Sequence, residues 1–306
     1  MKPPPPLSPS PVSEESDPYA EILQLLQKPL RSPWRFFLNN FFNVLCAAVS
    51  IAALLPLLSL LFLVIDKGLP LISWHLFTEL PPAPGLTGGG IGNALLGTAL
   101  MVGLAMAMAS PIGILAAIYI CEYRTGSRLA AAVRFTAKIL TGIPSIIAGV
   151  FAFGILVLTM GYFSALAGSV ALAVLALPTI ILTTEQALLS VPAAYREASY
   201  ALGATRFQTI YRVAIPEAIP AIITGHMLAI ARTAGESAPL LFTSLFNAYW
   251  NISPLEQTAS LSLLIFNNAT RSFDYQIQLA WAASLVLVVM VTVTNVIAQR
   301  IFARRH

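Results

Sequence analysis

The chain has 306 residues, of which 57% are hydrophobic and only 10% charged, with a formal net charge of +4 at pH 7. About a quarter of the residues in soluble globular proteins are charged, so this composition excludes a water-exposed surface over the whole chain. It predicts an integral membrane protein. The two cysteines, Cys46 and Cys121, lie in or at the end of apolar runs without metal-ligand spacing, so neither a disulfide framework nor a metal site is expected.

The N-terminal segment 1–35 begins with a stretch rich in proline and serine. It lacks the short apolar region and small-residue cleavage site of a signal peptide. We expect a disordered cytoplasmic tail, although proline-rich segments can also bind partners in an extended helix. The following segment, 36–66, is expected to remain as the first transmembrane anchor helix.

Six apolar stretches are long enough to cross a bilayer, which requires about 20 residues. We therefore predict an all-α integral membrane fold with six transmembrane helices, at approximately 41–65, 93–120, 139–160, 163–183, 218–245 and 279–299. Small residues recur within them, and these allow the backbones of membrane helices to approach closely.

The distribution of basic residues predicts the orientation. Of the 17 lysines and arginines, all but Lys67, Arg271 and Arg232 fall in the segments on one side of the six predicted spans. Because Lys and Arg are enriched in cytoplasmic loops, both termini are expected in the cytoplasm.

Within the six ranges the ionisable residues are His226, Arg232 and Glu236, all in the fifth span. An arginine at mid-membrane costs roughly 2.5–3.5 kcal/mol on insertion scales, which favours a functional role. Arg232 and Glu236 are four residues apart and can pair on one helical face. Either the pair lines a polar pathway in which the guanidinium attracts an oxyanion, or the two charges only neutralise each other. His226 is expected on another face, as a packing residue or a proton relay.

Two further segments carry local signals. The segment 246–278 contains the apolar run LSLLIF, which predicts a short helix that lies on the membrane or faces a partner. The loop 184–217 contains a helix-forming stretch up to Leu202, then Gly203, then a second amphipathic stretch that ends at Pro216. Glycine suits a left-handed helix cap and proline suits a first helical turn, so we expect two short helices that meet at a glycine corner.

The spacing in this loop resembles the EAA loop of ABC importer permeases. The residues that carry the resemblance are Glu197, Ala198, Ser199, Gly203, Ile215 and Pro216. Ser199 stands where the family pattern has alanine, and Ile215 where it has leucine. The resemblance implies a type I, MetI-like importer permease domain over residues 88–300, with 184–217 as the coupling loop that docks on a separate cytoplasmic ATPase subunit.

The stretch from Ala231 to Thr243, ARTAGESAPLLFT, is similar to the matching stretch of the PstA family of phosphate permeases, as are the motifs around Gly88–Ile91 and Gly142–Ile146. This resemblance implies phosphate import by alternating access. It also implies a second homologous permease, an extracytoplasmic phosphate-binding protein and surrounding membrane lipid as partners, and it maps the family's intramembrane Arg and Glu onto Arg232 and Glu236.

Motifs for other functions are missing. The sequence has no GxxxxGK[ST] for ATP phosphates, no HExxH, and no GxSxG with a convincing histidine. Neither does it carry an aromatic and basic surface for nucleic acid. No cofactor is therefore expected, and the chain is predicted to be a transport subunit rather than an enzyme. A permease for molybdate or sulfate, a passive anion channel, and an intramembrane enzyme using Glu236 or His226 remain as alternatives.

Overall fold

The computed structural model describes residues 33–303, which form helices joined by turns and loops, with no β-strand in that range. The helices are α2 (Pro33–Gly68), α3 (Trp74–Thr78), α4 (Gly92–Ile118), α5 (Arg128–Gly142), α6 (Ser145–Ala152), α7 (Leu158–Met160), α8 (Ala165–Leu189), α9 (Ala193–Ala201), α10 (Arg206–Thr209), α11 (Ile215–Gly235), α12 (Ala238–Leu241), α13 (Leu261–Ala269) and α14 (Asp274–Ala303).

Short helical turns of other types join several of these helices. A 3₁₀ turn, η1 (Leu69–Leu71), follows α2. Three π-helical turns are η2 (Tyr119–Tyr123) after α4, η3 (Phe153–Val157) between α6 and α7, and η4 (Ile210–Ala214) between α10 and α11. The predicted tail 1–35 lies outside the described residues except for its last three, which belong to the first turn of α2.

The chain divides between Leu60 and Leu61, inside α2, into two units. The described part of the first unit is a single apolar helix. Its Ser50 hydroxyl donates to the carbonyl oxygen of Cys46 at 2.8 Å, so a polar group within an apolar helix is satisfied by the helix's own backbone. The second unit contains all the other helices.

Five helical segments are long and apolar enough to cross a membrane, and a bent helix pair raises the number to six. The five are Phe36–Leu71, Gly92–Tyr123, Ala165–Leu189, Arg206–Gly235 and Asp274–Ile301. An all-helical fold with six spans is thus consistent with the structure.

The predicted third span, 139–160, is wrong as a single helix. Two helical segments, Arg128–Gly142 and Ser145–Met160, meet there at an angle of 105°. Pro144 lies at the break, and proline disfavours helical geometry in the residue before it and cannot donate a backbone hydrogen bond. Ile143 is accordingly extended, with φ −74° and ψ 134°.

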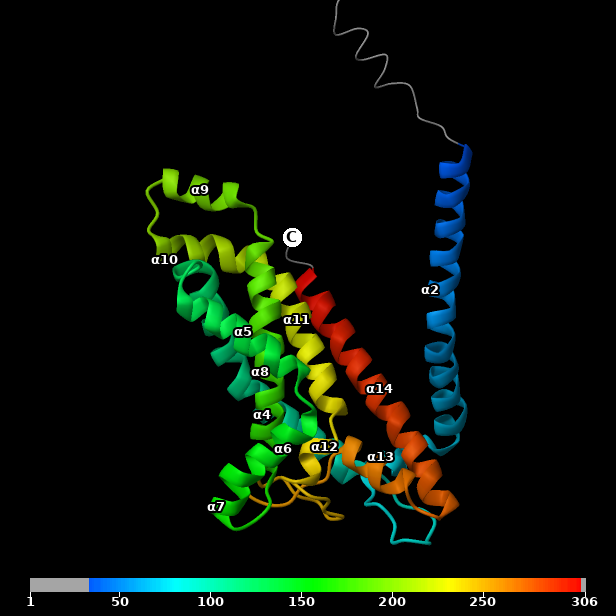
Figure 1. Ribbon diagram of the computed structural model, residues 1–306. Coiled ribbons are helices and arrows are strands. Elements are labelled where there is room, and N and C mark those ends of the chain that lie inside the picture. Colours follow the sequence, from blue (N-terminus) through cyan, green and yellow to red (C-terminus); the bar gives the residue numbers. More distant parts are fainter. Residues whose placement is uncertain (1–32, 304–306) are drawn as a thin grey trace, which may run out of the picture. The chain divides into compact units, whose positions relative to one another are not determined.

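Helix α8 is the most deeply buried span of the second unit, and it packs against α4, α5, α6 and α11 (Figure 1). Two glycines on its neighbours allow this packing. A Cβ atom on Gly113 of α4 would lie 2.6 Å from a methyl carbon of Ile180, and one on Gly225 of α11 would lie 2.3 Å from the hydroxyl oxygen of Thr183. The predicted use of small residues for close helix packing is therefore observed at these positions.

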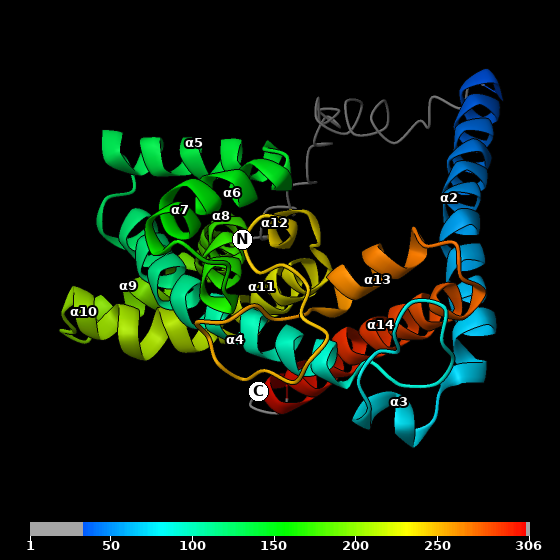
Figure 2. The same ribbon diagram turned by 90° about the horizontal axis from the view of Figure 1, so that it is seen from below.

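The predicted short helix in segment 246–278 is α13; one face of it is buried in the fold, and Phe266 on the other is exposed. Its residues Leu261 and Leu264 are buried in a cluster with Ile91 and Leu279, and Figure 2 shows α13 beside α14. The start of α13 is held by Thr98 of α4, whose hydroxyl accepts from the Leu261 amide at 2.8 Å.

The close contact of α4 with the segment before α13 leads to a stability prediction. A Cβ atom on Gly97 would lie 2.0 Å from the carbonyl oxygen of Ala259, whereas one on Gly103, also in α4, would meet nothing within 4 Å. We expect Gly97→Ala to destabilise the fold by about 1–3 kcal/mol through overpacking. Thermal unfolding of the detergent-solubilised protein measures the effect.

Gly103→Ala is the matched control, because it adds the same methyl group to the same helix in open space. It is expected to leave the unfolding temperature unchanged or slightly raised, since glycine costs a helix about 0.5–1 kcal/mol relative to alanine. Equal shifts in the two variants would contradict the packing role of Gly97.

Candidate transport pathway and coupling loop

Arg232 and Glu236 are close together at the end of α11. Arg232 lies in the last turn of the helix, and its Nε is 3.8 Å from Oε1 of Glu236. The Arg232 side chain is 38% exposed and that of Glu236 is 18% exposed. The distance is long for a charge-assisted hydrogen bond, so the guanidinium retains donors that can bind another group.

The predicted span 218–245 is wrong in its C-terminal part, because α11 ends at Gly235. Glu236 is extended, with φ −75° and ψ 122°, and the short helix α12 begins at Ala238. The break is stabilised by α13, whose Ser262 hydroxyl donates to the Glu236 carbonyl oxygen at 2.9 Å. Glu236 therefore approaches Arg232 from a break in the span, and not from the next turn of one continuous helix. Broken membrane helices of this kind commonly line polar cavities.

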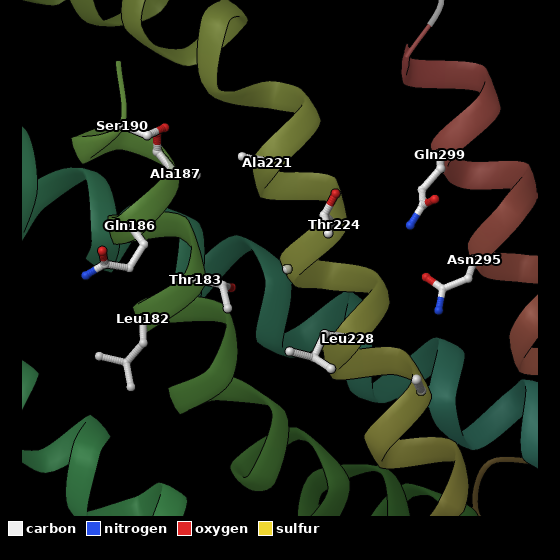
Figure 3. Close-up of a pocket in the computed structure, with 12 residues that line it drawn as sticks. Leu182, Thr183, Gln186, Ala187, Ser190, Ala221, Thr224, Leu228, Asn295 and Gln299 are labelled. Atoms are coloured by element: carbon white, nitrogen blue, oxygen red, sulfur yellow. The ribbon is translucent and has the colours of Figure 1, made fainter. Parts of the chain in front are cut away.

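A groove of about 630 Å³ lies between α8, α11 and α14; its exposed lining is mostly apolar and is interrupted by polar side chains (Figure 3). It includes Ala231, the residue before Arg232. Asn295 and Gln299, one turn apart on α14, point toward α11 (Figure 3). The remaining polar side chains that line it are Thr183 and Gln186 of α8, Ser190 directly after α8, and Thr224 of α11. All of these side chains are neutral. The three hydroxyls donate to nearby backbone carbonyl oxygens, so the donors that the groove offers are the amides of Gln186, Asn295 and Gln299.

The groove was not predicted from the sequence, although a signal was present. Amide side chains are unfavourable within a lipid-facing helix surface, so Asn295 and Gln299 at a spacing of four residues indicate a shared polar face of the last span.

His226 is partly buried on α11. Its Nδ1 is 2.9 Å from the carbonyl oxygen of Ile222, which can only accept, so Nδ1 is the donor in this contact. Nε2 is buried and has no hydrogen-bond partner among the described residues. The contact with Ile222 is a local helix contact, and it fits the packing interpretation of His226.

The loop after α8 forms the predicted glycine corner. Helix α9 ends at Ala201, and Gly203 has the left-handed φ of +81°. The chain then turns back into α10, where the Thr205 hydroxyl and the Gln208 side chain form a capping box. The second stretch is not a separate helix as expected. It continues through η4 into α11, so that Arg206–Gly235 is one helical segment with Pro216 in the first turn of α11.

The corner lies at one end of the bundle, beyond α4, α5 and α8, as Figure 1 shows. Glu197 and Ala198 of α9 are exposed, whereas Ser199 is half-buried and its hydroxyl is 2.9 Å from that of Thr209. This contact joins the two arms of the corner. Leu202, directly before Gly203, is 89% exposed, which leaves a large apolar side chain at the tip.

Sequence reasoning missed several charged residues because the predicted spans were too short. The spans extend to Tyr123 and Leu189, so they include the buried carboxylates Glu122 and Glu185. These carboxylates pair with Arg196 and Arg134, respectively. A carboxylate at the end of an apolar run, with arginines in the adjoining loops, was the available signal.

The fold and this site define a membrane transport subunit. Residues 109–306 match the family model described as "Binding-protein-dependent transport system inner membrane component". The chain belongs to this family and is a multi-pass protein of the inner membrane.

Relatives and solved structures agree with this assignment. The chain is 41% identical to the phosphate transport system permease protein PstA of Yersinia pestis, over 90% of this chain and 93% of the relative. The structure resembles that of a bacterial ABC transporter involved in the import of the acidic polysaccharide alginate, with a TM-score of 0.62, 18% identity, and coverage of 89% of this chain and 98% of the other.

It also resembles the MetNI methionine ABC transporter, with a TM-score of 0.55 and 23% identity over 70% of this chain and 94% of the other. At these identities the two structures define the fold, which is that of a MetI-like ABC importer permease.

Proposed function

We propose that this chain is the membrane permease subunit of an ATP-driven phosphate importer. The observation that carries the proposal is its 41% identity to a phosphate permease along 90% of its length. The chain would form half of the translocation pathway, and a second homologous permease would form the other half. An extracytoplasmic phosphate-binding protein would deliver the anion, and a separate cytoplasmic ATPase would supply the energy.

The proposed pathway runs past Arg232 and Glu236 and along the neutral groove. A guanidinium binds tetrahedral oxyanions through paired hydrogen bonds, and the 3.8 Å separation from Glu236 leaves the Arg232 donors accessible. Glu236 limits the net attraction, which favours release as well as entry. The neutral amides of the groove would then pass the anion on without a second strong charge.

The corner around Gly203 is the proposed coupling element, on the cytoplasmic side that the basic residues indicate. It consists of Glu197, Ala198 and Ser199 on α9, the glycine corner, and Ile215 and Pro216 at the start of α11. Its exposed outer surface can meet an ATPase, and its second arm is continuous with the helix that carries Arg232. ATP-driven movement of the corner would therefore shift α11 and open the pathway to alternate sides.

Uptake of labelled phosphate tests the cargo. Phosphate-starved cells with and without the gene are compared, with labelled sulfate as the control. Loss of high-affinity phosphate uptake alone is expected. Loss of sulfate uptake with normal phosphate uptake would instead assign a different oxyanion to the same permease.

Arg232→Gln is expected to leave assembly of the complex intact and to abolish phosphate uptake, because the oxyanion loses its only charged donor on α11 near the break. Uptake by cells and copurification of the partner subunits measure the two effects. Arg128→Gln, which removes an exposed arginine at the start of α5, is the control and should transport normally.

The double variant Arg232→Gln/Glu236→Gln separates pathway and pairing roles. If the arginine only neutralises Glu236, removing both charges restores uptake. If Arg232 binds the anion, uptake stays lost, which is the outcome that we expect.

Gly203→Val is expected to uncouple ATP hydrolysis from transport. A β-branched residue at φ +81° costs about 1–3 kcal/mol, so the corner must change its backbone to accept it. Phosphate uptake per ATP hydrolysed measures the effect in proteoliposomes. Gly126→Val, in a loop without a left-handed glycine, is the control. Wild-type coupling in Gly203→Val would remove the corner from the mechanism.

A further inference from the structure

Three arginines converge on the π-helical turn η2 at the end of α4. They are Arg134 of α5, Arg196 of α9 and Arg206 of α10. The last carbonyls of a helix lack intrahelical partners, and the negative end of the helix dipole favours cations there. The turn is therefore a natural acceptor for guanidinium groups, and each of the three comes from a different element.

Arg196 makes the most extensive contacts. Its Nη2 and Nε lie 2.6 Å and 3.2 Å from Oε1 of Glu122, and the side chains of Arg196 and Glu122 are only 19% and 8% exposed. The same guanidinium donates to the carbonyl oxygens of Leu188 at 2.8 Å and Val191 at 2.9 Å. One side chain of α9 thus holds both the end of α4 and the end of α8.

The two other arginines reinforce the turn. Arg206 donates to the Glu122 carbonyl oxygen, and its guanidinium lies 5.2 Å from the ring centroid of Tyr123. Arg134 donates to the carbonyl oxygens of Ile120 at 3.1 Å and Thr125 at 3.2 Å, and it pairs with Glu185 of α8.

Covalent connection alone would not link α9 to α4. Helix α9 is joined by short segments to α8 on one side and to α10 on the other, whereas α4 is distant in sequence. The contacts of α9 and α10 with α4 are made at η2 by Arg196 and Arg206. Helix α4 in turn packs along α8, so a displacement at η2 reaches the centre of the bundle.

We infer that Arg196 and Glu122 are positioning residues for coupling, through which movement of α9 is transmitted to α4 and α8 as well as to α11. This inference rests on the proposed function of the corner. A buried, multiply hydrogen-bonded pair resists separation far more than an exposed one, because either group left alone would be an unpaired buried charge. The pair therefore makes α9 and the ends of α4 and α8 move together.

The test is the number of phosphate ions taken up per ATP hydrolysed by the purified complex in proteoliposomes. Arg196→Gln is expected to lower this ratio by about tenfold, with ATP hydrolysis within about twofold of wild type, because the ATPase still turns over but its movement is not transmitted. Arg124→Gln, an exposed arginine directly after η2, is the matched control and should leave the ratio unchanged. An unchanged ratio in an assembled Arg196→Gln complex would overturn the inference.

Two further variants keep the test decisive. Glu122→Gln/Arg196→Gln should be no worse than Arg196→Gln alone, because residues that act as one unit are not additive. Additive losses would show independent roles.

If the Arg196→Gln complex does not assemble, Arg196→Lys tests the inference instead. It keeps the positive charge but loses the planar guanidinium that binds Glu122 and the two carbonyls. A wild-type ratio in Arg196→Lys would contradict the proposed positioning role.

The wild-type complex separates this inference from the proposed function. If it imports another oxyanion in place of phosphate, the assignment of cargo fails. The ratio is then measured with that anion, and the inference about Arg196 is still tested. If the complex transports without ATP, both fail.

Discussion

The structure depends on the close approach of helix backbones around α8. Membrane helices have no hydrophobic drive to associate, so van der Waals contact at short range must hold them together. Gly113 and Gly225 face α8 where a Cβ atom would clash with Ile180 and Thr183. These contacts fix α4 and α11 against α8, and they thereby set the position of the break that carries Glu236 and of the groove beside it.

The buried ion pairs at the ends of α4 and α8, and the break in α11, lie where this packing stops. At one end of the bundle, arginines saturate the carbonyls and carboxylates at the ends of α4 and α8. Near the other end, α11 breaks at Glu236 and α13 supplies a serine hydroxyl to the exposed backbone. Because unsatisfied polar groups are costly in a membrane, side chains that compensate for these two irregularities stabilise them. The proposed pathway and the proposed coupling element both lie at such compensated irregularities.

The sequence predicted features that depend on local chemistry and missed those that depend on tertiary contacts. Apolar length located the helical segments, and glycine at position 203 predicted a left-handed turn, which has φ +81°. The bend at Pro144 and the end of α11 at Gly235 were missed, because an apolar run does not reveal whether its backbone is continuous. The groove and the pair formed by Arg196 and Glu122 join residues far apart in the chain, so local signals indicated single polar faces and carboxylates but not which segments meet there.

The adjacent residues Arg196 and Glu197 place one side chain of α9 against the bundle and the next on its outer surface. Successive residues of a helix point about 100° apart, so a helix that lies on a bundle directs one inward and the next outward. Arg196 turns toward η2 and is largely buried, whereas Glu197 is exposed on the outer surface. The motif residues Glu197 and Ala198 are exposed, and they belong to the surface that we propose for docking of the ATPase. The arginine before them fastens that surface to the bundle, and in the proposed coupling a movement of α9 reaches α4 and α8 through it.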